Sequence, residues 1–387
     1  MSLNFLPDTP KRVAVAMSGG VDSSVAAYLM AKAGHEVVGL TAWTLNGPGK
    51  CCNDALVNAG RVCEMLNVPY DTVDLRAEFS HFVMDYYNNS YQAGLTPNPC
   101  VECNRYVKWE LLVRYAVDVL GVDYVATGHY AILSPAAHGV NVYRSVDEHK
   151  DQTYMMARVF PKDLSKTLFP LGEMTKPQVT ALARELDLPT AYSKESQDIC
   201  FVLNGQHNYM DLTFGKQPGN FVDADTGKVL GQHDGYYRFT LGQRKGIGVA
   251  AGRPVYVTKI DPHTKTVYLG DAHHLESTTF SVLSPNWLVP GLDEPDAFPR
   301  ELMVKIRYNS PPVLGRVEWL DYAAKSLKVT LHTPQSAITP GQIAAFYDTE
   351  FRQLLGGGYI ERYLSHQPFD ERKRDNLPDL YCQVTPA

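Results

Sequence analysis

The sequence predicts an N-terminal α/β domain with a parallel sheet, followed by two small domains that consist mainly of β-strands. Over the first 200 residues, short runs rich in Val, Thr and aromatic residues alternate with longer segments of helical pattern. This alternation indicates parallel strands joined by right-handed crossovers. After about residue 205, Gly, Pro and Asp interrupt short alternating segments at close intervals, which is typical of antiparallel barrels or sandwiches.

The elements of the N-terminal domain follow from its apolar pattern. We expect strands at 12–17, 36–43, 70–75 and 123–133, and helices at 23–34, 55–66 and 107–121 between them. A later helix is expected at 175–188, because Thr175 is a good N-cap and Pro177 is favourable in a first turn. This series is that of one parallel sheet covered by helices.

The two β domains are expected from four short alternating runs, at 254–261, 265–271, 302–309 and 326–333. The proline-rich segment 284–300 separates these runs into two groups. We therefore place an α/β domain at 1–208, a central β domain at 209–282, a C-terminal β-barrel domain at 283–365 and a flexible tail at 366–387.

The composition is that of an ordinary globular protein of 387 residues, with 44% hydrophobic and 20% charged residues. A net charge of −6 argues against a generally basic surface, so a nucleic-acid partner would have to meet local clusters. The available clusters are Arg238, Arg244 and Lys245, and Lys305 with Arg307. Runs of this kind are more often solvated faces than binding sites.

The cysteines are expected to serve thiol chemistry or metal binding. No run approaches the roughly 20 apolar residues of a membrane helix, and the first residues lack the apolar region of a signal peptide. We therefore expect a cytoplasmic protein with no membrane partner. Structural disulfides are rare in that reducing compartment, and the odd number of seven cysteines agrees.

The segment "MSGGVDSSVA", residues 17–26, lies between the first expected strand and the first expected helix. Backbone N–H groups at such a junction can hold an anion, although the spacing is not that of a Walker A loop and the loop has no lysine. Two glycines allow the amides to close round a pyrophosphate, the hydroxyls of Ser18 and Ser23 add donors, and Asp22 is a candidate for holding Mg²⁺. The alternative is an incidental glycine turn at a helix start.

Three cysteines lie in segments that favour sulfur chemistry. Cys100 and Cys103 form a C-x-x-C spacing in "TPNPCVECN", just before the helix expected at 107–121, and Cys200 lies in "SQDICF". A thiol near a helix N-terminus has a lowered pKa and therefore more thiolate, which sulfur transfer requires.

Nine ordered motifs make the pattern specific. They are SGGVDSS, TPNP..CN..VK, ATGHYA, KDQTY, LFPLGEMTKPQV, SQDICF, TLGQRKGIG, ITPGQIAAFY and LGGGYI, and they run from about residue 11 to 362. The glycine loop resembles that of the ATP-pyrophosphatase (PP-loop) superfamily, and the whole series resembles the bacterial tRNA-specific 2-thiouridylase family. The resemblance implies an adenine nucleotide alpha-hydrolase-like PP-loop catalytic domain, a tRNA-binding central β domain and a barrel similar to the second domain of elongation factor Tu.

The activity that this resemblance implies is ATP-dependent thiolation of the wobble uridine of lysine, glutamate and glutamine tRNAs, with AMP and pyrophosphate as products. ATP, with Mg²⁺, would first adenylate the 2-oxygen of the flipped uridine. A persulfide on Cys200 would then attack the activated carbon, and Cys103 would release the sulfur and end in a transient Cys103–Cys200 disulfide. A cysteine desulfurase or a sulfur-relay protein would supply the sulfur, and a cellular reductant would reopen the disulfide.

The resemblance also implies binding residues. Those for ATP are Ala16, Met17, Ser18, Gly19, Gly20, Val21, Asp22, Ser23, Ala42 and Gly128. Those for the target base and tRNA are Asn98, Pro99, Cys100, His129, Lys150, Asp151, Gln152, Arg307, Tyr308 and Gln342. A buried hydrogen-bonded histidine is an equally good interpretation of His129. Ordinary surface polarity is the alternative for 150–152, Arg307, Tyr308 and Gln342.

Two positions depart from the family pattern. Ala42 stands where many relatives have methionine near the adenine, and Cys100 stands where family members have an aspartate proposed as acid and base. An unshifted thiol has a pKa of about 8.5 against about 3.9 for Asp, so the two groups differ in charge at neutral pH. Cys100, Cys103 and Cys200 together could instead hold an iron-sulfur cluster with one iron open for a sulfide.

Other interpretations stay open at this point. A zinc site at Cys51, Cys52 and Cys63 is the weaker hypothesis, because adjacent cysteines rarely ligate one ion and Cys63 is expected to pack within a helix. The first rival function is a small-molecule adenylating ligase of the same superfamily, which needs no essential cysteine. The second is a tRNA-binding module without catalysis.

Overall fold

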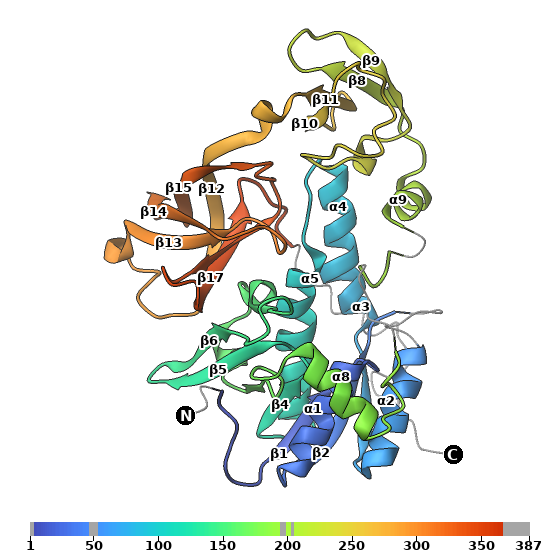
Figure 1. Ribbon diagram of the computed structural model, residues 1–387, viewed down its shortest axis with the longest axis vertical. Helices are drawn as coiled ribbons and strands as arrows, with labels where there is room; N and C mark the ends of the chain where they lie inside the picture. Colours follow the sequence, from blue (N-terminus) through green and yellow to red (C-terminus); the bar gives the residue numbers. More distant parts are fainter. Residues whose placement is uncertain (1–3, 46–52, 194–198, 203–204, 367–387) are drawn as a thin grey trace.

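The computed structural model describes residues 4–45, 53–193, 199–202 and 205–366, which form three packed bodies (Figure 1). The N-terminal body is built on a five-stranded sheet with the order β3-β2-β1-β4-β7. Its strands are β1 (Arg12–Ala16), β2 (Glu36–Trp43), β3 (Tyr70–Asp74), β4 (Tyr124–Thr127) and β7 (Thr167–Leu168). All neighbours pair in parallel, which confirms the α/β prediction.

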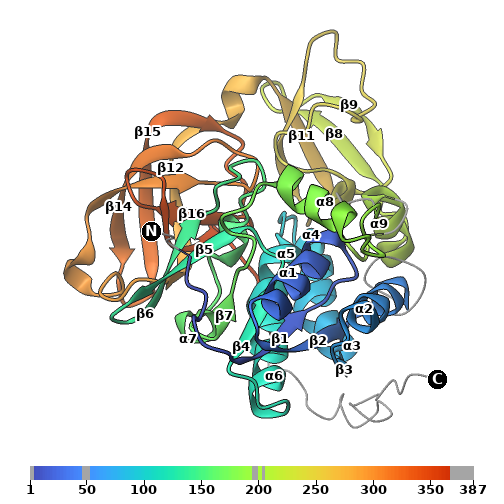
Figure 2. The same ribbon diagram turned by 60° about the horizontal axis from the view of Figure 1, so that its bottom comes forward.

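Helices cover both faces of this sheet. On one face, α1 (Val21–Lys32) packs against both α2 (Asn53–Leu66) and α8 (Lys176–Glu185), as Figure 2 shows. Side chains of β1 alternate between the faces, since Val13 and Val15 pack toward α1 and α2 whereas Ala14 faces the opposite side. The predicted N-cap of α8 is confirmed, because Thr175 and Gln178 form a capping box there.

Two long helical segments cover the other face, and both contain π-helical turns. The first consists of α3 (Arg76–Phe79), η1 (Ser80–Asp85) and α4 (Tyr86–Gln92), and it was not predicted. The second consists of α5 (Pro99–Glu102), η2 (Cys103–Val113) and α6 (Arg114–Asp118). Its expected start at residue 107 is wrong, because Asn98 Oδ1 accepts from Val101 N at 3.2 Å and caps the helix earlier. Cys100 and Cys103 therefore lie inside its first turns.

The run 123–133 is not one strand, which corrects the prediction. Strand β4 ends at Thr127, and β5 (Ala131–Ala136) then pairs with β6 (Gly139–Arg144) in a hairpin. Strand β6 pairs with β17 of the C-terminal body, so this hairpin extends a sheet made by residues far away in the sequence. The apolar pattern cannot show the break, because the residues on both sides of it favour strands.

The central body is a four-stranded sheet with the order β10-β11-β8-β9, preceded by α9 (Gln206–Phe214). Its strands are β8 (Gly219–Asp223), β9 (Val229–His233), β10 (Tyr256–Asp261) and β11 (Thr266–Gly270).

The single-turn helical segments of the described chain are η3 (Thr153–Met156), α7 (Pro161–Leu164), η4 (Tyr236–Arg238), η5 (Ala272–Leu275) and η6 (Pro295–Ala297). Within the described residues, no helix is long and apolar enough to cross a membrane.

The C-terminal body is a closed six-stranded barrel, as the sequence predicted. Its strands are β12 (Glu276–Trp287), β13 (Arg300–Lys305), β14 (Val313–Asp321), β15 (Ser326–Ser336), β16 (Ile343–Tyr347) and β17 (Gln353–Ile360). The order β12-β15-β14-β13-β16-β17 closes through pairing of β12 with β17. Closure leaves the barrel strands without a free edge, apart from the hairpin that β17 adds.

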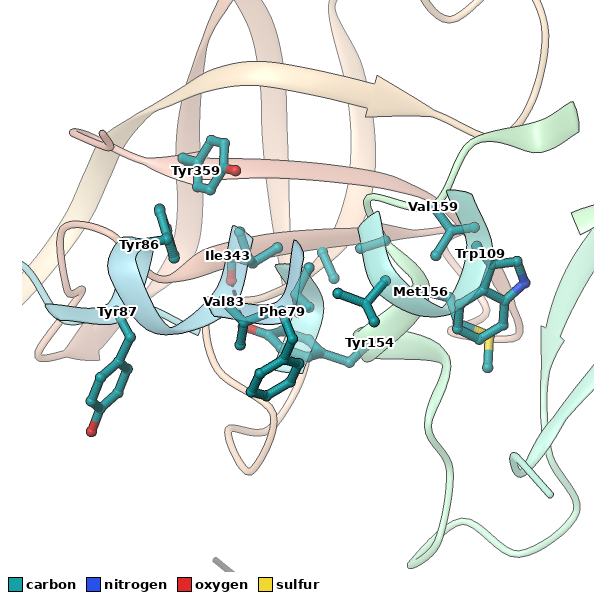
Figure 3. Close-up of a cluster of buried hydrophobic side chains, with 14 of the residues drawn as sticks. Phe79, Val83, Tyr86, Tyr87, Trp109, Tyr154, Met156, Val159, Ile343 and Tyr359 are labelled. Carbon is teal, nitrogen blue, oxygen red and sulfur yellow. Dashed lines mark hydrogen bonds between the residues drawn. The ribbon is translucent and has the colours of Figure 1, made fainter. Parts of the chain in front are cut away.

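A cluster of buried side chains joins the long helices to the barrel (Figure 3). Its labelled members are Phe79, Val83, Tyr86, Tyr87, Trp109, Tyr154, Met156, Val159, Ile343 and Tyr359. The hydroxyl of Tyr154 donates to the carbonyl oxygen of Ile343 at 2.7 Å, so its polar end is satisfied inside the core. Each such side chain contributes about 1.5–3 kcal/mol by burial, so the cluster fixes the barrel against the helix that carries the cysteines.

Candidate active site

The glycine loop joins β1 to α1, and its geometry requires glycine at one position. Gly19 has φ of +69°, and a Cβ there would lie 2.6 Å from the backbone oxygen of Ala55. The hydroxyl of Ser23 donates to the carbonyl of Gly20 (3.0 Å) and accepts from the backbone N of Ser18 (3.2 Å). Ser18 and Ser23 line a cavity, so the loop presents the N-terminus of α1 to it.

Asp22, in the first turn of α1, is held by two partners from distant segments. Its Oδ1 accepts from Nζ of Lys176 at 2.7 Å and from the hydroxyl of Tyr130 at 2.9 Å. Lys176 is the first residue of α8, and the sequence analysis assigned it no role. One signal was available, because a lysine in the first turn of a helix opposes the helix dipole and indicates an anionic partner nearby.

The turn after β4 packs directly on the start of α1. A Cβ on Gly128 would lie 2.7 Å from the backbone N of Ser23 and 2.7 Å from the carbonyl carbon of Asp22, so this position accepts only glycine. The contact brings the residues that follow Gly128 to the edge of the glycine loop.

His129 is fixed in this turn by rings and hydrogen bonds. Its ring packs near Trp109 and Phe169, with centroid distances of 5.2 and 6.2 Å. Its Nδ1 lies 2.8 Å from Thr127 Oγ1, and its Nε2 lies 3.3 Å from Nζ of Lys108. Burial and the charge of Lys108 lower the pKa of His129 well below its ordinary value, so the imidazole is neutral at physiological pH.

One cavity of about 400 Å³ lies between these elements. The residues that we predicted for the site and that line it are Ala16, Met17, Ser18, Asp22, Ser23, Ala42, Pro99, Cys100, Cys103, Gly128, His129, Gln152 and Cys200. Gly19 and Gly20 in the loop and Val21, the first residue of α1, do not line the cavity, and Asn98 caps the helix beside it. A largely apolar wall with a few polar groups is typical of small-molecule sites.

The three cysteines of the predicted sulfur chemistry share this cavity. Cys100 is exposed, Cys103 and Cys200 are half-buried, and all three are thiols rather than members of disulfides. The first two lie at the N-terminal end of the same helix, where the helix dipole favours a thiolate. Cys200 is anchored by its neighbour Phe201, whose ring packs edge-on against Phe79 at 5.9 Å.

Besides Asn98, five residues predicted to contact tRNA do not line the cavity: Lys150, Asp151, Arg307, Tyr308 and Gln342. Three of them use their polar groups within the protein. Asp151 is buried, and its carboxylate accepts from Ser145 N (3.2 Å) and Thr153 Oγ1 (2.8 Å). Arg307 donates to Leu241 O, Ala337 O and Thr339 Oγ1, which ties the barrel to the central body.

Gln342 ties the barrel to the loop before the cysteine helix. Its Nε2 donates to the carbonyl oxygens of Thr96 (2.9 Å) and Pro97 (3.1 Å). Tyr308 is half-buried, with its ring 6.0 Å from that of Tyr154, and Lys150 is partly exposed.

The remaining cysteines do not form a described site. Cys63 is buried in α2, and burial raises its pKa to about 12, so its predicted packing role is confirmed. Cys51, Cys52, Cys382 and the tail 367–387 lie outside the described residues. His366, the first residue of the expected tail, is described, and its Nε2 lies 2.9 Å from Glu102 Oε2.

One group of three metal-ligating side chains is found among the described residues. Asp225, His273 and His274 have ligand atoms that all lie within 4.8 Å of one another. The group is exposed on the central body and includes no cysteine. Its carboxylate already contacts His274 Nε2 at 2.8 Å and lies 3.7 Å from Arg253.

A parallel sheet, a glycine turn that leads into a helix, and a cavity shared by that turn and three thiols define a PP-loop nucleotide-binding enzyme. Comparison with family models agrees with this class. Residues 11–204 match the tRNA methyl transferase HUP domain, 207–271 match the tRNA methyl transferase PRC-barrel domain, and 277–360 match the aminomethyltransferase beta-barrel domain.

Curated relatives cover almost the whole chain. The tRNA-specific 2-thiouridylase MnmA of Synechococcus sp. is 42% identical over 356 residues, which are 91% of this chain and 98% of that protein. The enzyme of the same name from Synechocystis sp. is 42% identical over 355 residues, 90% of this chain and 97% of that protein. The chain belongs to the tRNA-specific 2-thiouridylase family, a family of sulfur-transferring enzymes that modify tRNA, as the nine motifs indicated.

One solved structure resembles part of this chain. The U34-tRNA thiolase NcsA from Methanococcus maripaludis with its [4Fe-4S] cluster aligns with a TM-score of 0.36 and 20% identity. The alignment covers 49% of this chain and 62% of that chain. At this TM-score the likeness supports no inference about the site.

Proposed function

We propose that the protein converts the wobble uridine of lysine, glutamate and glutamine tRNAs to 2-thiouridine, with ATP as activating substrate and a Cys200 persulfide as sulfur carrier. The observation that supports this most directly is that the PP loop and three thiols line one cavity. A small-molecule ligase would have no use for three thiols beside its nucleotide. A tRNA-binding module without catalysis would need neither the loop nor the thiols.

In the first stage, the 2-oxygen of the flipped uridine attacks the α-phosphorus of ATP. A bond from that oxygen to phosphorus forms, the bond to the departing pyrophosphate breaks, and the proton on N3 leaves to a base, for which a Cys100 thiolate is our candidate. The amides at the start of α1, with Ser18 and Ser23, would hold the β and γ phosphates. A Walker lysine serves γ-phosphate transfer, so its absence fits adenylation.

In the second stage, the terminal sulfur of the Cys200 persulfide attacks C2 of the uridine, and AMP leaves with the former uridine oxygen. The thiolate of Cys103 then attacks Sγ of Cys200. This step releases the 2-thiouridine sulfur and forms a Cys103–Cys200 disulfide, so that the two thiols supply the two electrons that the transferred sulfur gains. A cellular reductant would reopen the disulfide, and a cysteine desulfurase or a relay protein would reload Cys200.

A Mg²⁺ ion fits one side of the site. Oδ1 of Asp22 accepts from Lys176 and Tyr130, whereas the described residues donate no hydrogen bond to Oδ2. One carboxylate oxygen, with substrate phosphates and water, is a usual ligand set for Mg²⁺. When bound there, the ion would neutralise charge on the leaving pyrophosphate.

The two β domains would hold the anticodon stem and loop. We expected them at 209–282 and 283–365, whereas β12, the first strand of the barrel, begins at Glu276. In the predicted cluster of the central domain, Arg238 pairs with Asp211 at 2.6 Å, which leaves Arg244 and Lys245 exposed for phosphate contacts. Local patches of this kind allow a chain of net charge −6 to bind RNA.

The second candidate function is thiolation through an iron-sulfur cluster on Cys100, Cys103 and Cys200. It is favoured by the presence of all three thiols on the wall of one cavity, since three thiolates can hold a cluster with one iron open. An iron and sulfide assay of anaerobically purified protein separates the two chemistries. A stoichiometric cluster would replace the persulfide relay, and an iron-free active protein would exclude the cluster.

The proposed function is tested by incubating the protein with ATP, Mg²⁺, a sulfur donor of verified activity and unmodified glutamate tRNA. The RNA is then digested, and its nucleosides are analysed by mass spectrometry. We expect 2-thiouridine together with AMP and pyrophosphate in equal amounts. Absence of 2-thiouridine under these conditions would exclude the proposal.

A further inference from the structure

Lys108 reaches the cavity because the helix that carries it is π-helical. The segment Cys103–Val113 bonds from residue i to i+5, so a residue five positions further on returns to the same side of the helix. Lys108 stands five positions after Cys103, and both line the cavity. In an α-helix of 3.6 residues per turn these two side chains would point in clearly different directions. π-helical turns are often found at functional sites.

The hydrogen bonds of His129 fix how the Lys108 ammonium is used. An ammonium group is only a donor, so it donates to Nε2 of His129 across 3.3 Å. The imidazole proton is then on Nδ1, from which it donates to Thr127 Oγ1 at 2.8 Å. The neutral imidazole accepts one N–H of the ammonium group but carries no negative charge, so it does not compensate the positive charge of Lys108.

The charge inventory of the cavity singles out this group. Among the described lining residues, Lys108 is the one lysine or arginine, and Asp22 is the one carboxylate. Asp22 is already paired with Lys176. No carboxylate of the described residues forms an ion pair with Lys108. The cavity therefore offers one uncompensated cation to an anionic ligand.

The position of this cation lies between the two chemical ends of the site. Its hydrogen-bond partner His129 follows Gly128, which packs against the backbone of Asp22 and Ser23 at the pyrophosphate loop. Its own helix carries two of the three thiols, Cys100 and Cys103, and Cys200 lines the same cavity. In the reaction proposed above, the phosphate that lies between the leaving pyrophosphate and the carbon that receives sulfur is the α-phosphate.

We propose that Lys108 is a catalytic residue whose ammonium group binds the α-phosphate of ATP, and afterwards the phosphate of the adenylated uridine, with His129 holding it in place. This inference rests on the proposed function. In the first stage the cation stabilises the negative charge that develops on the non-bridging oxygens as the P–O bonds exchange. In the second stage it stabilises AMP as the leaving group. The lysine gives up no proton and forms no covalent bond.

The test compares Lys108→Met, Lys108→Gln and Lys108→Arg with the wild type. Pyrophosphate release is measured with unmodified glutamate tRNA and no sulfur donor, in a single turnover of adenylation, and ATP affinity is measured by titration. We expect a loss of roughly 100- to 1000-fold in the adenylation rate for the two neutral variants, with ATP affinity changed by less than about fivefold. Lys108→Arg should recover part of the rate. Far-UV circular dichroism checks folding, and a variant that does not fold leaves the other two to decide.

The second measurement asks whether the lysine acts on the thiols instead. The rate of Cys103 and Cys200 alkylation by iodoacetamide is followed against pH in the wild type and in Lys108→Met. Unchanged profiles with slow adenylation support the α-phosphate role. Adenylation within about threefold of the wild type, or a shifted thiol profile with normal adenylation, would overturn it. If the wild type itself releases no pyrophosphate with tRNA, the proposed function fails, which is a separate outcome.

Discussion

The ammonium nitrogen of Lys176 lies 2.7 Å from Oδ1 of Asp22, although 154 residues separate the two in the sequence. The pair is partly enclosed, with side chains 15% and 33% exposed, and it stands at the start of α1 where the phosphates would bind. The contact ties the first residue of α8 to the first turn of α1, beside a loop that has no lysine of its own.

Replacement of Lys176 by Met should weaken ATP use. Without the cation, the carboxylate of Asp22 would repel the phosphates, so we expect kcat/KM for ATP to fall roughly ten- to hundredfold. The measurement is tRNA-dependent pyrophosphate release at varied ATP concentration. Lys32→Met, at the exposed far end of α1, is the matched control and should leave kcat/KM unchanged. A Lys176→Met protein within twofold of the wild type would contradict this role.

Glu102 is a buried carboxylate on which three segments converge. It accepts from Tyr359 OH (2.8 Å) and His366 Nε2 (2.9 Å), and its Oε1 lies 3.8 Å from Nε of Arg158. Glu102→Ala should lower the free energy of unfolding by about 3–5 kcal/mol, because it leaves Arg158 buried without its partner. Urea unfolding measures this loss. Glu110→Ala, on a less buried side of the same helix, is the control and should cost much less.

The contribution of Glu102 to the free energy of unfolding should decrease as the pH falls. Burial alone would raise its pKa, but the hydrogen bond from His366 and the charge of Arg158 outweigh burial and lower it. The stabilisation is therefore complete above the unfolded pKa of about 4.3 and is lost as the pH falls through the folded pKa. The stability difference between wild type and Glu102→Gln should be constant from pH 7 to about 5 and shrink below about 4. A difference that grows in acid would contradict the network.

His129 should also make a pH-dependent contribution to the free energy of unfolding, in a higher pH range than Glu102. Its folded pKa is well below the unfolded value of about 6.5, because of burial and the charge of Lys108. The unfolded chain therefore binds more protons in acid, and the stabilisation present above pH 6.5 or so is lost as the pH falls. Urea midpoints of wild type and His129→Gln should converge between pH 7 and 5. The exposed His149→Gln control should show no such convergence, and equal behaviour of both variants would contradict the assignment.

Gln342→Ala should slow thiolation more than it destabilises the fold. It removes two hydrogen bonds to the loop before the cysteine helix, each worth about 1 kcal/mol, and so loosens the loop rather than the core. We expect a several-fold slower rate of 2-thiouridine formation with a shift of at most about 2 kcal/mol in unfolding. Gln335→Ala, whose side chain donates to the carbonyl oxygen of the neighbouring Pro334, is the control and should leave the rate unchanged. Equal rates for both variants would show that the loop does not need this tie.

The parallel sheet and the glycine loop could be predicted because their signals are local. Strand β1, the two glycines and the start of α1 follow one another within a short stretch of sequence. Gly19 and Gly128 each lie so close to another backbone segment that no side chain fits, and both belong to short sequence motifs. The three thiols could be assigned to one site through the order of the motifs.

The features that could not be predicted depend on pairing across the chain. The run 123–133 is divided between two sheets, because β4 pairs with β1 whereas β5 pairs with β6, which in turn pairs with β17. Polar contacts of Asp22 and Glu102 come from the distant residues Lys176 and His366. The π-helical winding that turns Lys108 toward the cavity has no sequence period of its own to reveal it. These features are visible only in the folded structure, because the local preference of a residue for helix or strand does not reveal which distant residue will contact it.

The most direct test of the account separates adenylation from sulfur transfer in a Cys200→Ser variant. With ATP, Mg²⁺, a verified sulfur donor and unmodified glutamate tRNA, pyrophosphate release and 2-thiouridine are measured in the same reaction. We predict pyrophosphate release in the first turnover within about threefold of the wild type and no detectable 2-thiouridine, because the cation and loop that activate the uridine remain and the sulfur carrier is gone. Formation of 2-thiouridine by this variant at more than about a tenth of the wild-type rate would contradict the account.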